Sequence, residues 1–361
     1  MTVEQAWQRT PGGSGTYVAE LTRALDELGG TRVVGLVARH GSDEVADPDF
    51  APVVARTAAS RLPRAALYEA WNSAGRPRAE RIAREPLDLV HATTWAVPPT
   101  RLPLVVTVHD LAFLDEPSHF TPRGVRFFRR SLDRVRAEAD RVVVPSQQTF
   151  DACVAAGMDA SVLRLVPHGV RVAAPSPEAV SRFRSRHGLD RPYVLWCGTR
   201  EPRKNLRGLL EAYTRAGSAL EHDLVLVGPR GWGDLDLGAE DGPGRDGVRW
   251  LGKLSAAELA SAYAGADVFC FPSFAEGFGM PALEAMAHGV PVVTSRGTPM
   301  ADLVGDAGRA VDPGDANALA DALVTVARAR ADWSAAALRR ASAFTWEHAA
   351  RLTAGVYGEL A

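Results

Sequence analysis

The chain has 361 residues, of which 46% are hydrophobic and 23% charged, and its formal net charge is −2. This composition is that of an ordinary globular protein, and the near-zero net charge gives no reason to expect a nucleic-acid partner. The length is natural for two domains, because a single hydrophobic core rarely grows to this size.

The cysteines and the start of the chain exclude further classes of protein. Cys153, Cys197 and Cys270 are odd in number and lack CxxC spacing, so neither a disulfide framework nor a zinc cluster is expected. Residues 1–15 lack the pattern of a secretory signal, and no apolar run approaches the roughly 20 residues that span a bilayer. We therefore expect a cytoplasmic protein, with any membrane contact peripheral and at the inner face of the membrane.

Short apolar segments of strand length alternate with helical stretches along the chain. In the first half they are residues 31–39, 87–94, 102–110, 140–146 and 162–170. In the second half they are residues 192–198, 223–228, 248–252, 267–273, 291–295 and 309–313. Most are apolar on both faces, which is typical of a parallel sheet that is covered by helices on both sides.

A Pro- and Ser-rich joint followed by a charged amphipathic helix, residues 171–192, separates the two series. The pattern predicts an α/β protein with two tandem doubly wound, Rossmann-like parallel-sheet domains. We place the first domain at residues 1–172, the second at 173–340 and a terminal helix within 341–361. Because ligands bind outside the carboxyl ends of the strands in such sheets, the expected site is an interdomain cleft.

A basic loop follows the first strand of the second series. The strand ends at Gly198, and Arg200, Arg203 and Lys204 come before the next helix. Cations at this position suit a diphosphate, because the helix N-terminus supplies N–H donors and the side chains supply positive charge. Lysine occurs elsewhere only at Lys253, so its use here favours a functional role over a solvated basic turn.

The segment AEGFGMPALE, residues 275–284, places two glutamates eight positions apart. Gly277 and Gly279 let the backbone approach a ligand, and the free N–H groups at the following helix start form an anion pocket. Glu284 is the only charge in an apolar helix, and a buried carboxylate needs a partner. The alternative is that Glu276 is a charge in the cap region and that Glu284 lies on a solvated helix face.

These segments resemble those of a known enzyme family. Residues 276–293, EGFGMPALEAMAHGVPVV, resemble the E-x7-E signature of retaining glycosyltransferases of family 4, which have the GT-B fold. Residues 198–206, GTREPRKNL, are similar to the phosphate-binding loop of that family. The resemblance extends over essentially the whole chain: residues 9–17 are similar to the family's glycine-rich acceptor-side loop, and residues 344–360 to a terminal helix that crosses back onto the first domain.

In the second domain, the resemblance implies a set of residues that binds a nucleotide sugar. Arg203 and Lys204 would hold the diphosphate and neutralise the leaving group. Glu276 would hydrogen-bond the hydroxyls of the donor sugar, and Glu284 would bind the ribose hydroxyls. The rest of the set would line the sugar and phosphate with backbone: Gly198, Gly277, Phe278 and Gly279.

In the first domain, the resemblance implies an acceptor side. Residues 105–114, VVTVHDLAFL, resemble the strand whose terminal histidine faces the sugar. His109 would lie near the anomeric carbon, by backbone or side chain, and it joins Glu276 and Lys204 as a candidate catalytic residue. His91 is either a structural histidine or an acceptor contact. The loop that approaches the phosphate and acceptor would contain three glycines, Gly12, Gly13 and Gly15.

The expected function is that of a retaining, metal-independent enzyme that moves a hexose from a nucleotide diphosphate sugar to an acceptor hydroxyl. The acceptor would be a glycan, a lipid-linked molecule or a small molecule. Positive side chains and a helix N-terminus can stabilise the diphosphate without a metal or another cofactor. We predict that the DLD sequence at 234–236 belongs to a Gly/Asp-rich surface loop and not to a metal site.

Residues 107–113 and 198–206 most resemble those of mannosyltransferases that use GDP-mannose, and this resemblance implies mannose as the donor sugar. UDP-glucose and UDP-N-acetylglucosamine are alternatives of the same fold. A GT-B phosphorylase, a sugar-nucleotide epimerase and a non-catalytic binding protein are the other readings, and the presence of both glutamates with the Arg-Lys pair disfavours the last.

Two further features concern the first domain. Residues 61–85 and 121–140 are arginine-rich and amphipathic, so they either rest on an anionic membrane and admit a lipid-linked acceptor or pack on the sheet with solvated arginine faces. Residues 1–9 are short and polar where the family has an apolar central strand. Either this first strand is weak, or the natural chain starts upstream of Met1.

Overall fold

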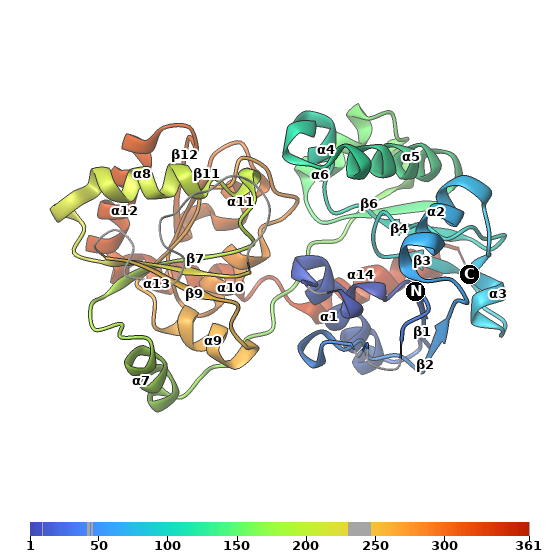
Figure 1. Cartoon of the computed structure of the whole chain (residues 1–361), viewed down its shortest axis with the longest axis horizontal. Coiled ribbons are helices and arrows are strands. Elements are labelled where there is room, and N and C mark those ends of the chain that lie inside the picture. Colours follow the sequence, from blue (N-terminus) through green and yellow to red (C-terminus); the bar gives the residue numbers. More distant parts are fainter. Residues whose placement is uncertain (9, 42–43, 45, 230–246, 361) are drawn as a thin grey trace. The chain divides into compact units, whose positions relative to one another are not determined.

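The computed structural model describes residues 1–8, 10–41, 44, 46–229 and 247–360. The chain forms two compact units, the first made of Met1–Gly169 with Thr345–Ala361 and the second of Val170–Phe344 (Figure 1). Each unit is built on parallel β-sheet with helices packed on it. The predicted α/β class with two parallel-sheet domains is therefore confirmed.

The first unit contains two parallel sheets that the first residues of the chain connect. The strands of these sheets are β1 (Val34–Val37) and β2 (Arg56–Ala59), and then β3 (Val90–Ala92), β4 (Leu104–Thr107), β5 (Arg141–Val144) and β6 (Leu163–Leu165). Thr2 forms a parallel bridge to Leu36 of β1, and its N–H donates to the carbonyl of His91 in β3 over 3.0 Å. Residues 1–8 thus contribute a single bridge between the two sheets in place of the family's apolar central strand.

The sequence analysis did not predict β2. Its residues, RTAA, bury one side chain of four, so they lack the apolar run by which the other strands were recognised. The strand is in the sheet because its backbone pairs with all four residues of β1.

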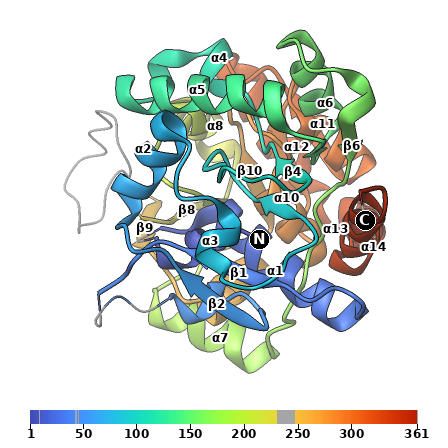
Figure 2. The ribbon, with the colours of Figure 1, turned by 90° about the vertical axis from the view of Figure 1, so that its right-hand side faces the viewer.

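Seven helices cover the described part of this unit. They are α1 (Gly12–Leu28), α2 (Arg64–Ala74), α3 (Ala79–Ala83), α4 (Ala112–Asp115), α5 (Pro122–Glu138), α6 (Gln147–Ala155) and α14 (Trp346–Gly358). The last of these packs against α1, although more than three hundred residues separate them in the sequence. Helix α2 lies beside α5 (Figure 2). The stretch 61–85 is thus two helices, α2 and α3, joined by a short loop.

The chain enters α14 through a tight backbone crossing. A Cβ atom added to Gly169 would lie 2.1 Å from the backbone nitrogen of Trp346. We expect Gly169→Ala to lower the free energy of unfolding by about 1–3 kcal/mol, because backbone must move to admit the methyl group. Gly355→Ala is the matched control: Gly355 lies in α14 with nothing within 4 Å of an added Cβ, so this change should stabilise by about 0.5–1 kcal/mol. Chemical unfolding of both variants measures the change in the free energy of unfolding. Equal changes in the two variants would contradict the close backbone contact at Gly169.

The second unit is a single six-stranded parallel sheet. In spatial order its strands are β12 (Gly308–Val311), β11 (Val292–Ser295), β10 (Val268–Phe271), β7 (Tyr193–Cys197), β8 (Asp223–Val227) and β9 (Val248–Gly252). The chain begins in the middle with β7, builds outward to β9, and then returns to the other side of β7 with β10. The strand order therefore reverses between β7 and β10, and this is where ligands bind in open α/β sheets.

Helices pack on both faces of this sheet. They are α7 (Pro177–Arg186), α8 (Leu206–Ala216), α9 (Ala256–Ala264), α10 (Met280–Ala287), α11 (Pro299–Val304), α12 (Ala316–Arg328) and α13 (Arg330–Ala341). Helices α8 and α12 lie together on one face, and α9 and α10 lie on the other (Figure 1). Between the layers the strands bury large side chains such as Trp196 and Phe269.

The units divide after Gly169, whereas the sequence placed the division after residue 172. The terminal helix expected within residues 341–361 is α14, which belongs to the first unit. Among the described residues, no helix is both long enough and apolar enough to cross a bilayer.

Candidate functional site

The two signature segments of the second unit meet at the point where the strand order reverses. β7 and β10 are parallel neighbours, so the loops that follow them leave the same edge of the sheet. The N–H of Phe274 donates to the carbonyl of Arg203 over 2.9 Å, and the guanidinium of Arg203 donates to the carbonyl of Ala275 over 2.7 Å. These bonds join the basic loop after β7 to the glutamate-containing loop after β10.

Glu276 lies between two cations at this junction. Its Oε1 atom is 2.6 Å from Nζ of Lys204 and 3.0 Å from Nη1 of Arg203, and all three side chains are at most 15% exposed. The ammonium of Lys204 also lies 4.7 Å from the centre of the Phe271 ring, at the end of β10. The three predicted side chains therefore form one compact, nearly buried ion cluster.

The charges of this cluster shift the pKa values of Glu276 and Lys204. Burial by itself would raise the pKa of Glu276, but the positive charges of Arg203 and Lys204 outweigh it and lower this pKa to about 2. Burial and the like charge of Arg203 lower the pKa of Lys204, and Glu276 opposes the shift. Glu276 is thus a carboxylate throughout the physiological range, and it is an ion-pair partner rather than a residue of the helix cap.

Asn205 fixes the end of the basic loop, and the sequence analysis missed its role. Its backbone is left-handed, with φ of 51°, and its side-chain oxygen accepts the N–H of Gly208 over 3.2 Å to cap α8. Its amide nitrogen donates to the carbonyl of Pro313 over 2.8 Å. Asn is among the few residues that tolerate this conformation and is a favoured N-cap, so its place before the helix was a usable signal.

The turn before α10 is shaped by a glycine. Gly279 is the N-cap of α10 with φ of 101°, and a Cβ atom there would lie 2.4 Å from the Cγ atom of Met300 in α11. Only glycine fits this backbone, and the turn places the buried residues Gly277 and Phe278 directly before the helix. The predicted start of α10 is confirmed, with Pro281 in its first turn.

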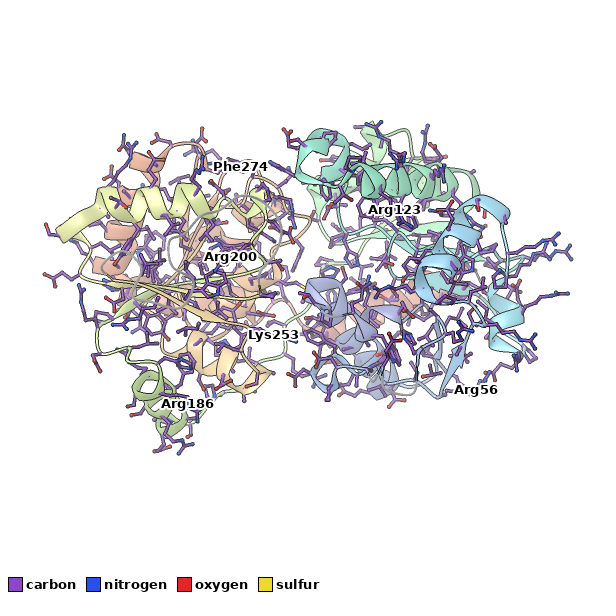
Figure 3. All side chains as sticks on the ribbon, in the orientation of Figure 1. Arg56, Arg123, Arg186, Arg200, Lys253 and Phe274 are labelled. Atoms are coloured by element: carbon purple, nitrogen blue, oxygen red, sulfur yellow. The ribbon has the colours of Figure 1, made fainter. Side chains whose placement is uncertain are left out.

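Gly198 and Gly228 allow the strand ends beside the basic loop to come close together. A Cβ atom added to Gly228, which has φ of 134°, would lie 2.0 Å from the carbonyl oxygen of Gly198. Arg200, two residues further along the loop, lies 3.8 Å from the centre of the Trp250 ring in β9 (Figure 3). Cation–π contact of this kind holds the loop over the sheet edge.

Glu284 lies one turn inside α10 and has a partner of its own. The hydroxyl of Tyr263 in α9 donates to its Oε2 atom over 2.9 Å. Burial raises the pKa of Glu284 to about 7, and the Tyr263 hydrogen bond reduces the shift. The charges of Glu284 and Lys204 both act on the thiol of Cys197 at the end of β7. The carboxylate is therefore not on a solvated helix face, and it belongs to the same sheet edge as the ion cluster.

His109 follows β4 in the first unit. Its Nε2 atom is 3.0 Å from the carbonyl oxygen of Thr93. Because a carbonyl only accepts, Nε2 carries the proton and Nδ1 carries the lone pair. Burial lowers the pKa of His109, and the Thr93 bond and Asp110 oppose the shift. The ring is therefore neutral at physiological pH and held in one tautomer.

His91 proves to be structural. Its Nδ1 atom lies 2.7 Å from the hydroxyl of Tyr357 in α14, and its Nε2 atom lies 2.7 Å from the hydroxyl of Thr107. Burial lowers the pKa of His91 to about 3, so it stays neutral. With both nitrogens bonded and the ring 1% exposed, the reading as an acceptor contact is disfavoured.

The glycine loop leads directly into α1. Gly12 is the first residue of that helix, and its φ of 60° and the exposure of Gly12 and Gly13 leave backbone N–H groups at the surface. Gly15 is different, because a Cβ atom there would lie 2.3 Å from Cβ of Pro11 and 3.0 Å from the Phe50 ring. Gly12 and Gly13 thus expose their backbone to solvent, whereas Gly15 lets Pro11 and Phe50 pack closely against α1.

The predicted residues fall into two groups. Those assigned to the donor all lie in the second unit, and His109 lies with the three loop glycines in the first. The DLD sequence at 234–236 lies outside the described residues.

Comparisons with known proteins agree with this geometry. Residues 11–174 match the family model described as Glycosyltransferase Family 4, and residues 191–329 match that of Glycosyl transferases group 1. The chain is 32% identical over 281 residues to the O-antigen chain mannosyltransferase B of Escherichia coli, which covers 74% of each protein. It is 30% identical, over an alignment of 394 positions, to the D-inositol 3-phosphate glycosyltransferase 2 of Catenulispora acidiphila, and the alignment covers 96% of this chain and 90% of the other.

The fold has close counterparts among solved structures. Anabaena HepE in complex with UDP and glucose superposes with a TM-score of 0.76 at 20% identity, over 99% of this chain and 98% of the other. This likeness confirms the predicted GT-B fold. Together with the family models and the relatives, it shows that the chain is a hexosyltransferase that belongs to glycosyltransferase family 4.

Proposed function

We propose that this glycosyltransferase moves a hexose from a nucleotide diphosphate sugar to an acceptor hydroxyl, with retention of configuration and without a metal ion. The observation that supports this most is the ion cluster of Arg203, Lys204 and Glu276 at the point where the strand order reverses. Two cations there match the charge of a diphosphate leaving group, and a carboxylate beside them can accept hydrogen bonds from sugar hydroxyls.

The roles in the reaction follow from the chemistry of each group. When the glycosidic bond to the diphosphate breaks, negative charge grows on the phosphate oxygen, and the cations of Arg203 and Lys204 stabilise it without having to reorganise. The N–H groups of the turn before α10 add donors at a helix start. Glu276 orients the sugar through its hydroxyls, and Glu284 accepts hydrogen bonds from the ribose.

We propose GDP-mannose as the donor. The name of the Escherichia coli relative, a mannosyltransferase, supports this choice. UDP-glucose and UDP-N-acetylglucosamine are the alternatives, and the UDP and glucose bound to HepE favour a uridine donor instead. The acceptor is a glycan, a lipid-linked molecule or a small molecule. The cytoplasmic location and the peripheral membrane contact stay predictions.

The test is an assay of the purified protein with each of the three donors and a panel of acceptor sugars, in EDTA. We expect one donor to give nucleoside diphosphate and an α-linked product, and an inverted linkage or complete loss of activity in EDTA would overturn the proposal. Incubation with donor alone is the control for the other enzyme classes. A change in the donor sugar without any acceptor indicates an epimerase, and phosphate-dependent release of a sugar phosphate from a glucan indicates a phosphorylase.

The pKa of Glu284 gives the proposal a pH signature. Since this pKa is raised to about 7, the carboxylate that would accept the ribose hydroxyls is mostly protonated at pH 6 and mostly ionised at pH 8. We expect the affinity for the donor nucleotide to rise by up to about tenfold over this interval. Isothermal titration calorimetry of the wild type and of Glu284→Gln measures it.

Glu284→Gln is the control because the nucleotide phosphate itself titrates in the same range. Only the part of the pH dependence that the substitution removes belongs to Glu284. Identical pH profiles for the two proteins would contradict its assignment to the ribose.

A further inference from the structure

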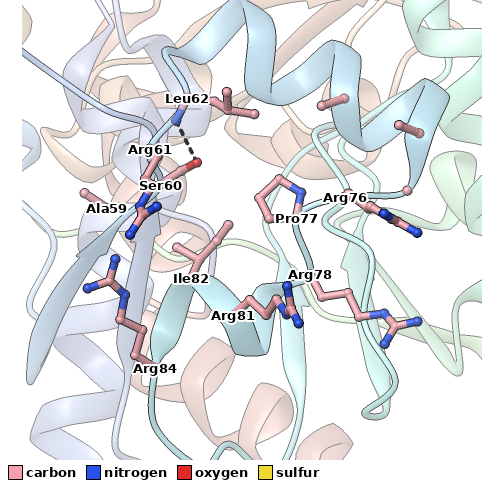
Figure 4. A pocket seen from close by; sticks show the side chains of 13 residues that line it. Ala59, Ser60, Arg61, Leu62, Arg76, Pro77, Arg78, Arg81, Ile82 and Arg84 are labelled. Carbon is pink, nitrogen blue, oxygen red and sulfur yellow. Dashed lines mark hydrogen bonds between the residues drawn. The ribbon is translucent and has the colours of Figure 1, made fainter.

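The first unit contains a cavity of about 870 Å³ that none of the proposed donor-binding residues lines. It lies between the end of β2, the last turn of α2, the loop that follows α2, and α3 (Figure 4). Among the described residues that line it, five are arginines and none is acidic. They are Arg61, Arg76, Arg78, Arg81 and Arg84, which we call the arginine pocket.

In the part of the chain that the structure describes, the arginines of the pocket form no ion pair with a carboxylate. Among the residues that the structure describes, no carboxylate lies within 4.0 Å of any of the five guanidinium groups. The two nearest acids in the sequence form their hydrogen bonds and ion pairs with other groups, although the charge of Arg78 helps to lower the pKa of Glu80. Glu85 pairs with Arg32 and Arg56, and Glu80 accepts the hydroxyl of Thr100 and the N–H of Arg101.

The arrangement of the side chains fits an anion. Figure 4 shows Arg61 and Arg84 on one side of the apolar residue Ile82, and Arg76 and Arg78 on the other side, beyond Pro77. Guanidinium groups on both sides of a cavity can each donate two parallel hydrogen bonds to a phosphate. A cavity of this volume also lies in the range of small-molecule sites.

The backbone of Arg84 provides an independent observation. This residue ends α3 in the left-handed region with φ of 57°, and Asn205 is the only other described residue apart from glycine with a positive φ. For an arginine this conformation is less favourable than the right-handed region. Where glycine would be favoured for conformation, the chain has instead a side chain that adds a cation to the pocket.

We propose that the arginine pocket binds a ligand with more than one phosphate charge, as a diphosphate or a bisphosphate has. Five cations that pair with no carboxylate among the described residues repel one another, and an anion of several charges reduces that repulsion while its oxygens satisfy the guanidinium donors. None of the five residues belongs to the proposed donor site, and all lie in the first unit whereas the donor residues lie in the second. The pocket therefore shares no residue with the proposed donor site. A soluble phosphate compound and a phospholipid headgroup both have the chemistry that it would recognise.

Isothermal titration calorimetry with inorganic pyrophosphate tests the site. The variant is Arg81→Ala combined with Arg84→Gly, both exposed, and glycine suits the left-handed backbone of the second position. The control is Arg129→Ala combined with Arg328→Ala, which removes the same charge from exposed helix positions outside the pocket. We expect the pocket variant to lose one equivalent of bound pyrophosphate, or to bind it about tenfold or more weakly, and the control to match the wild type.

The stoichiometry separates this proposal from the proposed function. If the donor site also binds pyrophosphate, the wild type takes up two equivalents and the pocket variant one. If the donor assignment is wrong, the wild type binds one equivalent of pyrophosphate and the pocket variant binds none. Unchanged pyrophosphate binding in the pocket variant overturns the proposal, and so does an equal loss in the control, because either result shows that the five arginines are not a specific site.

Vesicles distinguish the two sources of the phosphate. Co-sedimentation is measured with phosphatidylcholine vesicles that contain or lack phosphatidylglycerol. Loss of vesicle binding in the pocket variant, together with loss of pyrophosphate, supports a headgroup as the ligand. Vesicle binding that the substitutions leave unchanged, together with loss of pyrophosphate, supports a soluble one.

Discussion

Glu276→Gln should bind a nucleoside diphosphate more tightly than the wild-type protein does and yet turn over the donor about 10²–10³-fold more slowly. In the absence of a donor, Glu276 holds both Lys204 and Arg203, at 2.6 and 3.0 Å. A diphosphate must compete with this carboxylate for the two cations. A neutral amide competes less, whereas it also binds the sugar hydroxyls less well when the transition state forms.

The substitution also has a cost for the fold. Breaking a nearly buried ion pair by removal of one partner typically destabilises by about 3–5 kcal/mol, because the remaining charges are left uncompensated. We therefore expect Glu276→Gln to unfold at a lower temperature without ligand and to gain more stability from nucleotide than the wild type does. Thermal unfolding with and without GDP and UDP measures both changes, and steady-state kinetics measures turnover.

Two other variants serve as a comparison and a control for Glu276→Gln. Lys204→Ala should weaken nucleotide binding and slow turnover. Its effect on binding is thus opposite to that of Glu276→Gln, which should tighten nucleotide binding. Glu201→Gln removes the same charge from the same loop, where the carboxylate lies 3.5 Å from Arg203, and it should change both quantities much less. A Glu276→Gln protein with near-normal turnover, or with weaker nucleotide binding, would refute the assignment.

His109→Gln should lower turnover about a hundredfold or more and leave donor affinity nearly unchanged. The amide nitrogen of glutamine can keep the bond that Nε2 makes to the carbonyl of Thr93, but nothing then occupies the position of Nδ1. Since burial lowers the pKa of His109, Nδ1 carries a lone pair at neutral pH. It could therefore accept a hydrogen bond or a proton if His109 has the proposed catalytic role.

His109→Asn separates the two ways in which His109 could act. Asparagine places its polar group near the position of Nδ1, so this variant should keep more activity than His109→Gln if the side chain acts. Full activity in both variants would mean that only the backbone at this position matters. His91→Gln is the control, because it removes bonds to Tyr357 and Thr107 and should reduce stability without reducing turnover per folded molecule.

The elements that could be predicted from the sequence are those whose side chains are buried on both faces. In the second unit, β7, β8, β10 and β11 are buried over almost their whole length, so their positions followed from their apolar runs. The sequence did not predict β2 because three of its four side chains are exposed, and the strand is held by backbone pairing to β1. Backbone pairing does not depend on residue type, so the sequence gives no sign of it.

The candidate site was predictable residue by residue but not as a set of partners. The position of Glu276 after a strand indicated a polar site, whereas its pairing with Lys204 depends on β7 and β10 being neighbours in the sheet. Tyr263, the partner of Glu284, comes from a different helix and lies 21 positions away in the sequence. Contacts between residues distant in the sequence depend on which strands and helices are neighbours in the fold. A single sequence does not show which elements are neighbours.

Helix α14 has a consequence for how the molecule is made. Tyr357 completes the hydrogen bonds of His91, Glu359 pairs with Arg141 and Arg164, and the helix itself covers α1. All of these partners leave the ribosome before the second unit is synthesised, whereas α14 leaves after it. On the ribosome, the second unit can therefore reach its final packing first, and the unit at the N-terminus begins synthesis first but is the last to be complete.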